Sequence, residues 1–177
     1  MSGARAARGA VLEWSDAWPG WSPRGTLALA VDPARWPPPA AALVIDDAVF
    51  AAKRELHVTL VGRELGAEVL AAIAEGRIAA PALRAAFAGQ RWRLRRSGLR
   101  VRLRKPPPAR DIESVIEPVA MPAMARFHGW LGQALGRALP VPPPHVTLYV
   151  RGDAEGIGVP DEASLARYRC GEWREPF

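Results

Sequence analysis

The tetrapeptide His57-Val-Thr-Leu60 occurs twice in this chain of 177 residues, and its second copy is His145-Val-Thr-Leu148, 88 residues later. Each copy lies in an apolar, β-branched stretch that predicts a strand, over residues 55–62 and 144–150. Successive side chains of a strand point to opposite faces. Each copy therefore places its histidine and threonine on one face and its valine and leucine on the other, and we expect the apolar face to be buried.

The two copies use two of the three histidines in the chain and are separated by about half its length. A repeat of this kind indicates a duplicated half-domain. If the halves pack about a pseudo-twofold axis, two imidazoles and two hydroxyls converge, and our candidate catalytic residues are His57, Thr59, His145 and Thr147. A single His-x-Thr on a strand is usually an incidental, half-exposed pair. The identical second copy favours catalysis over coincidence or a decayed binding cleft.

The remaining pattern mixes strands and helices. Apolar spacing predicts strands over residues 26–31, 112–119 and 166–173, and helices over 65–75, 82–88 and from Pro122 to about 138. The fold class is α+β, with two similar lobes, antiparallel sheets flanking a central cleft and helices on the outside. We expect residues 1–25 to form a partly flexible N-terminal segment and residues 26–177 to form one two-lobed domain. The tryptophans at 14, 18 and 21 would either cap the core or stack on a base.

A basic segment carries the positive charge of the chain. Residues 91–105 hold eight basic residues and no acid, whereas the whole chain has a formal charge of +6. Arginines alternate with apolar residues, which predicts a hairpin turning at Ser97-Gly98 with one arginine face. That face could contact an RNA backbone or protect a solvated strand edge. The candidate substrate-binding residues are Arg100, Arg102 and Arg104.

Other features exclude several classes of protein. No apolar run reaches the roughly 18 residues that a membrane span needs, and with Cys170 as the single cysteine there is no internal disulfide and no cysteine-based zinc site. The chain lacks the HExxH zinc motif and the GxxxxGK[ST] phosphate loop. We expect a cytoplasmic monomer with no cofactor, no metal and no membrane partner.

The paired His-x-Thr motifs resemble those of the 2H phosphoesterase superfamily, which includes bacterial RNA 2′,5′-ligases and cyclic nucleotide phosphodiesterases. The resemblance extends from residue 26 to the C-terminus. It implies two lobes around a cleft that is lined by His57, Thr59, His145 and Thr147. It also implies metal-independent hydrolysis of 2′,3′-cyclic phosphates on RNA ends or nucleotides. The alternatives are 2′,5′-RNA ligation and a non-catalytic RNA-binding module.

The chemistry of a cyclic phosphate explains why two histidines are suitable. Water must lose a proton and a ribose oxygen must gain one, on opposite sides of the phosphorus. An imidazole, with a pKa of about 6.5, can act as base or acid near neutral pH. Threonine hydroxyls can donate hydrogen bonds to the non-bridging oxygens. His128 has no threonine two residues away, and we interpret it as a structural residue.

Overall fold

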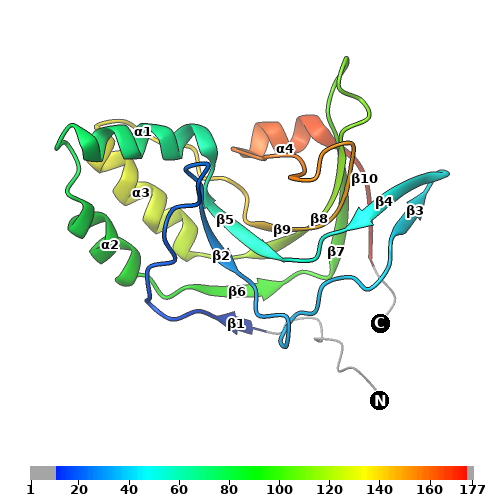
Figure 1. Ribbon diagram of the computed structural model, residues 1–177, viewed down its shortest axis with the longest axis horizontal. Helices are drawn as coiled ribbons and strands as arrows, with labels where there is room; N and C mark the ends of the chain where they lie inside the picture. Colours follow the sequence, from blue (N-terminus) through cyan, green and yellow to red (C-terminus); the bar gives the residue numbers. More distant parts are fainter. Residues whose placement is uncertain (1–10, 175–177) are drawn as a thin grey trace.

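The computed structural model describes residues 11–174, which form ten strands and four helices (Figure 1). The strands are β1 (Val11–Glu13), β2 (Leu27–Ala30), β3 (Leu43–Ile45), β4 (Ala48–Ala52), β5 (His57–Val61), β6 (Arg93–Arg96), β7 (Leu99–Arg104), β8 (Glu113–Ala120), β9 (His145–Arg151) and β10 (Arg169–Arg174). The helices are α1 (Arg63–Ala74), α2 (Ala80–Ala88), α3 (Ala123–Leu135) and α4 (Glu162–Tyr168). The α+β class is confirmed. Of the N-terminal segment 1–25, which we expected to be partly flexible, the first ten residues lie outside the described part.

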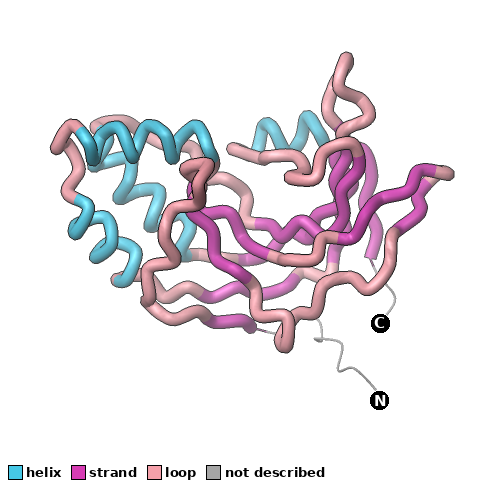
Figure 2. Tube along the Cα trace, viewed as in Figure 1, coloured by secondary structure: helices cyan, strands magenta, loops and turns pink. Residues whose placement is uncertain are grey.

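The strands form a curled, antiparallel sheet organised around β8 and β9. One edge of β8 pairs with β9, and its other edge pairs with both β6 and β7. The far edge of β9 pairs with β5 and with β4. Helices α1, α2 and α3 gather at one end of the sheet and α4 lies apart from them (Figure 2). No helix within residues 11–174 is both long and apolar enough to cross a bilayer.

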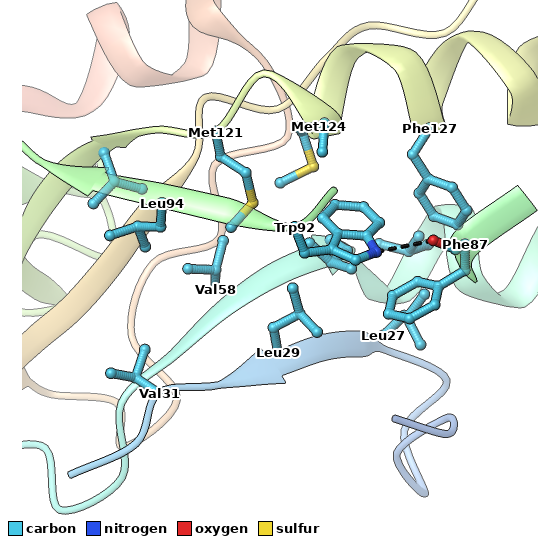
Figure 3. Packing of buried hydrophobic residues seen from close by; sticks show 14 of the residues in the cluster. Leu27, Leu29, Val31, Val58, Phe87, Trp92, Leu94, Met121, Met124 and Phe127 are labelled. Carbon is cyan, nitrogen blue, oxygen red and sulfur yellow. Dashed lines mark hydrogen bonds between the residues drawn. The ribbon is translucent and has the colours of Figure 1, made fainter. Parts of the chain in front are cut away.

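The larger hydrophobic core lies between the sheet and helices α1 to α3. Figure 3 shows Trp92 in the middle of it, where its indole N–H donates to the carbonyl oxygen of Phe87 at 3.0 Å. Trp18 meets Phe87 edge to face, with ring centroids 5.2 Å apart. Aromatic pairs of this geometry add about 0.5–1.5 kcal/mol beyond their buried area. Trp14, Trp18 and Trp21 all pack on this cluster, so the N-terminal tryptophans cap the core.

The surroundings of the two motif strands repeat with the same offset of 88 residues. Along β2 and β5 the partners are Ala30 with His57, Leu29 with Val58 and Ala28 with Thr59. Along β8 and β9 they are Pro118 with His145, Glu117 with Val146 and Ile116 with Thr147. The N–H of Val31 donates to Leu56 at 2.8 Å, as that of Val119 does to Pro144 at 2.9 Å. The backbone arrangement is therefore the same around both copies.

The prediction of a hairpin over the basic segment is wrong. Strands β6 and β7 do not pair with each other, and both pair with β8. The positive φ of Gly98, 68°, marks the break between them. The N–H of Gly98 donates to a carboxylate oxygen of Glu117 at 3.0 Å. The break therefore interrupts one continuous edge along β8 instead of reversing the chain.

The prediction of a strand over residues 166–173 is wrong in its first half. Helix α4 occupies residues 162–168, and β10 follows it directly and pairs with β7. The carboxylate of Asp161 accepts the N–H of Ser164 at 2.7 Å and caps the helix. Leu165 and Tyr168 pack on a second, smaller core with Val101, Leu103 and Ile116.

Candidate active site

Val58 and Val146 are direct partners across the antiparallel strands β5 and β9. Antiparallel register then sets His57 opposite Thr147 and Thr59 opposite His145. Both valines are fully buried, whereas the four motif side chains on the other face are half-buried. Directly opposite side chains in such a pair have Cβ atoms about 4.5–5.5 Å apart. The strand pairing therefore brings the four candidate catalytic residues into one cluster on one face.

A β-bulge follows the threonine of each motif. The register shifts past Leu60 in β5 and past Leu148 in β9, so each leucine is the extra residue. Because a bulge redirects the side chains beyond it, Tyr149 packs against the larger core although it lies two residues after Thr147. In each motif strand, the alternation that puts the histidine and threonine on one face therefore stops at the threonine.

The ring of His145 has a fixed orientation. Its Nδ1 lies 2.8 Å from the carbonyl oxygen of Pro143, which can only accept, so Nδ1–H donates. Nε2 is then the nitrogen that can take up or release a proton. Burial lowers the pKa of His145, the hydrogen bond to Pro143 opposes this, and nearby His57 lowers the pKa further. The two imidazoles therefore influence each other electrostatically.

The ring of His57 has a mixed electrostatic environment. Burial lowers the pKa of His57 most, and the charge of Lys53 lowers it further. The carboxylates of Glu155 and Glu55 act in the opposite direction, but the pKa stays below its ordinary value. At neutral pH, both histidines in the free protein are therefore mainly uncharged.

Lys53 is a site residue that the sequence reasoning missed. Its backbone N–H donates to Leu148, the bulge residue of the second motif, at 2.8 Å. Its ammonium donates to the carbonyl oxygen of Ala154 at 2.9 Å. The sequence offered one indication of its importance. Lys53 is one of only two lysines in a chain with 24 basic residues, and it stands four residues before His57.

The segment after β9 closes over the second threonine. A Cβ on Gly156 would lie 3.4 Å from Cγ2 of Thr147 and 3.0 Å from Oγ of Ser114, and Gly156 has a φ of +82°. Only glycine adopts such a backbone conformation without strain. This glycine therefore lets residues 153–156 approach the motif face closely.

Of the three candidate arginines, the structure withdraws Arg100 and Arg102 from solvent and leaves Arg104 exposed. Arg100 and Arg102 are buried, at 6% and 7% exposure, and they pair with Glu117 and Glu113. Arg104 is partly exposed and shares Glu113 at 3.3 Å. Strand β7 also has neighbours on both edges, β8 and β10. Both interpretations of this face, an RNA-contacting surface and a protected strand edge, are therefore wrong for Arg100 and Arg102.

The sequence reasoning missed the two glutamates of β8, which occupy the same sheet face as the arginines. Burial by itself would raise the pKa of Glu117, but a hydrogen bond from Arg96 and the charge of Arg100 outweigh it and hold the pKa below its ordinary value. Arg102 has the same effect on the pKa of Glu113, against the same opposing burial. The signal was the spacing of Glu113 and Glu117, whose even separation puts them on one face of the strand.

Within residues 11–174, no group of three or more His, Cys, Asp or Glu side chains is arranged to hold a metal ion. Comparison of the chain with protein-family models, with curated proteins and with solved structures finds no match.

Proposed function

We propose that this chain is a metal-independent phosphoesterase that acts on 2′,3′-cyclic phosphates of RNA ends or nucleotides. Its catalytic residues are His57, Thr59, His145 and Thr147. The observation that carries the proposal is the pairing of Val58 with Val146, which gathers two imidazoles and two hydroxyls on one sheet face. Without a shared face, the two His-x-Thr motifs could not act on the same phosphate group.

The proposal includes two similar lobes related by an internal duplication, with the site in a cleft between them. It is supported by the constant 88-residue offset in strand register, backbone hydrogen bonding and bulge position around the two motifs. If the four residues recurred by chance, the neighbouring strand would not be expected to pair in the same register at both copies.

In the proposed hydrolysis, a water oxygen forms a bond to phosphorus as one bond from phosphorus to a ribose oxygen breaks. One imidazole takes the proton that the water loses, and the other gives a proton to the departing ribose oxygen. The products are a phosphomonoester and a free hydroxyl group. Such proton transfers each contribute about 10² to 10⁴-fold to the rate.

The threonines support the same step. The hydroxyls of Thr59 and Thr147 lie on the face of the two imidazoles and can donate to the non-bridging phosphate oxygens. Donors held in place by the strands stabilise the growing charge without having to reorganise. The fixed ring of His145 presents Nε2 for proton transfer, because Nδ1 is engaged by Pro143.

Turnover of cyclic mononucleotides and of RNA with a cyclic phosphate end tests the proposal. We expect His57→Gln and His145→Gln each to reduce kcat/KM by at least about 10²-fold, with the thermal transition retained. Thr59→Val and Thr147→Val preserve side-chain shape, and each should reduce kcat by about 10-fold or more. Full activity in either histidine variant would overturn the mechanism.

Two further outcomes separate the alternatives. Joining of RNA ends without hydrolysis would favour 2′,5′-RNA ligation, which uses the same proton transfers in reverse. RNA binding without any turnover would favour a non-catalytic binding module.

A further inference from the structure

A surface hollow of about 680 Å³ lies beside the motif face, lined by Arg24, Arg63, Asp153, Ala154 and Glu155. Its lining is connected to the candidate catalytic residues. Lys53 binds the carbonyl oxygen of Ala154, and the charges of Lys53 and Glu155 both act on His57. Residues 154 and 155 therefore connect the hollow to His57.

A close backbone contact places the two arginines at the hollow. A Cβ on Gly66 would lie only 1.7 Å from the carbonyl oxygen of Gly25, so the turn before β2 is pressed onto the first turns of α1. Figure 1 shows this segment against the start of that helix. The turn is itself held by a hydrogen bond of 2.9 Å from the N–H of Gly25 to Ser22. Arg24 therefore stands near Arg63, the first residue of α1.

The two arginines differ in their partners. Arg24 pairs with Glu155 at 2.9 Å, and both side chains are more than half exposed. Asp153 accepts the backbone N–H of Glu155 at 2.9 Å and holds that residue in its loop. Arg63 makes no ion pair with any other residue in the described range 11–174. An exposed pair such as Arg24 with Glu155 contributes little to stability, so a phosphate group can replace the carboxylate.

We infer that this hollow is a second anion subsite, in which Arg24 and Arg63 bind the phosphate on the 5′ side of the terminal nucleoside and Glu155 is displaced from Arg24. The inference rests on the proposed function. In an RNA chain that ends in a 2′,3′-cyclic phosphate, the next phosphate group can only lie on the 5′ side of the terminal nucleoside. A cyclic mononucleotide with a free 5′-hydroxyl lacks it. The subsite therefore favours RNA ends over cyclic mononucleotides as substrates.

The test compares kcat/KM for a dinucleotide with a 2′,3′-cyclic phosphate against that for the cyclic mononucleotide. We expect Arg24→Gln and Arg63→Gln each to lower the ratio of the two values by about fivefold, and Glu155→Gln to raise it by a similar factor. Changes in the pKa of His57 affect both substrates and cancel in the ratio. Each lost phosphate contact should also flatten the salt dependence by a slope of about 0.7.

Arg77 and Glu75 provide the matched control. They form an exposed ion pair of 2.7 Å at the opposite end of α1. Because a helix rises about 1.5 Å per residue and exposed charges are screened within about 8 Å, Arg77→Gln and Glu75→Gln should leave the ratio unchanged.

The outcomes distinguish the subsite from the proposed function. An unchanged ratio in the Arg24 and Arg63 variants, with both substrates still hydrolysed, would overturn the subsite alone. Absence of turnover by the native protein would overturn the proposed function. In that case, calorimetric binding of the ring-opened dinucleotide and mononucleotide, each tested as the 2′- and as the 3′-phosphate, gives the same comparison. Equal affinity for both products would then overturn the subsite as well.

Discussion

Nε2 of His128 lies 2.8 Å from the carbonyl oxygen of Leu60, so the imidazole N–H of α3 donates to the bulge residue of the first motif strand. The ring is buried, at 2% exposure. A bulged residue leaves backbone groups outside the regular ladder, and this hydrogen bond satisfies one of them. The expectation that His128 is structural agrees with this position, and the ring belongs to the core instead of the surface.

We predict that His128→Phe lowers the free energy of unfolding by about 1–3 kcal/mol, because the buried carbonyl of Leu60 loses its donor. Chemical denaturation measures the change. Arg126→Gln is a suitable control on the same helix, because Arg126 is exposed and bonds only Gln90 in the described structure. Equal stability of the His128 variant and the native protein would contradict the structural role.

The stability of the protein should fall as pH drops below about 6.5. Burial lowers the pKa of His128, His57 and His145 in the folded chain. The unfolded chain, with ordinary values near 6.5, therefore binds more protons in this range, and stability decreases as pH falls towards the folded values. Denaturation midpoints between pH 5 and 8 check the sign. Stability that increases on acidification would contradict it.

The pH dependence of catalysis should follow the same two site histidines. If one imidazole must be neutral and the other protonated, kcat/KM is bell-shaped, with two apparent pKa values that belong to the pair. Because both are lowered in the free protein, the maximum should lie below pH 6.5.

Lys53→Gln should move one limb of this profile to higher pH, because the charge of Lys53 lowers the pKa of His57. Lys105→Gln removes the only other lysine of the chain and serves as the control. A profile that shifts equally in both variants would show that net charge, and not the position of Lys53, sets the pKa.

The arginines of β7 should contribute unequally to stability. Arg102→Gln removes the 2.6 Å partner of the buried carboxylate of Glu113, which keeps Arg151 at 2.8 Å, and should cost about 1.5–3 kcal/mol. Arg104→Gln removes a contact of 3.3 Å made by a side chain that is 42% exposed and should cost less than about 1 kcal/mol. Comparable losses in the two variants, measured by denaturant titration, would argue against a buried network centred on Arg102.

Gly156→Ala should reduce both stability and turnover. The alanine would have to adopt a φ near +82° with its Cβ crowding Ser114 and Thr147, at a cost of about 1–2 kcal/mol. Gly158→Ala is the control, because a Cβ there meets no atom within 4 Å. A Gly156 variant that behaves like the Gly158 variant would show that residues 153–156 do not approach the motif face.

The sequence predicted the motif strands well because the period of a strand is a local property. The strand at 26–31 and the helix at 65–75 were also confirmed, as strand β2 and helix α1. The sequence did not predict which strands pair. In residues 91–104, arginines alternate with apolar residues as they would in a hairpin. The buried carboxylates of Glu117 and Glu113, which lie further along the sequence, instead pair with arginines of β6 and β7 and hold both strands along β8.

Shorter elements were missed for related reasons. The β3–β4 turn depends on positive φ angles at Asp46 and Asp47, 48° and 62°, a conformation that aspartate adopts less often than glycine. The site constellation was predicted from the repeat, whereas Lys53, Arg24 and Arg63 reach it through turns and the contact between Gly25 and Gly66. A pattern of residue types does not reveal such close approaches.

The pairing of Val58 with Val146 makes the protein far more sensitive to changes in length than to changes in side chain at this point. A one-residue deletion inside β9 at Tyr149, with Val150 and Arg151 kept in register, would slip the second motif by one position and turn it to the opposite face. The apolar side chains would then meet solvent, and the imidazole and hydroxyl would enter the core. Length variation in natural or engineered versions of this chain should therefore be confined to the connections between strands.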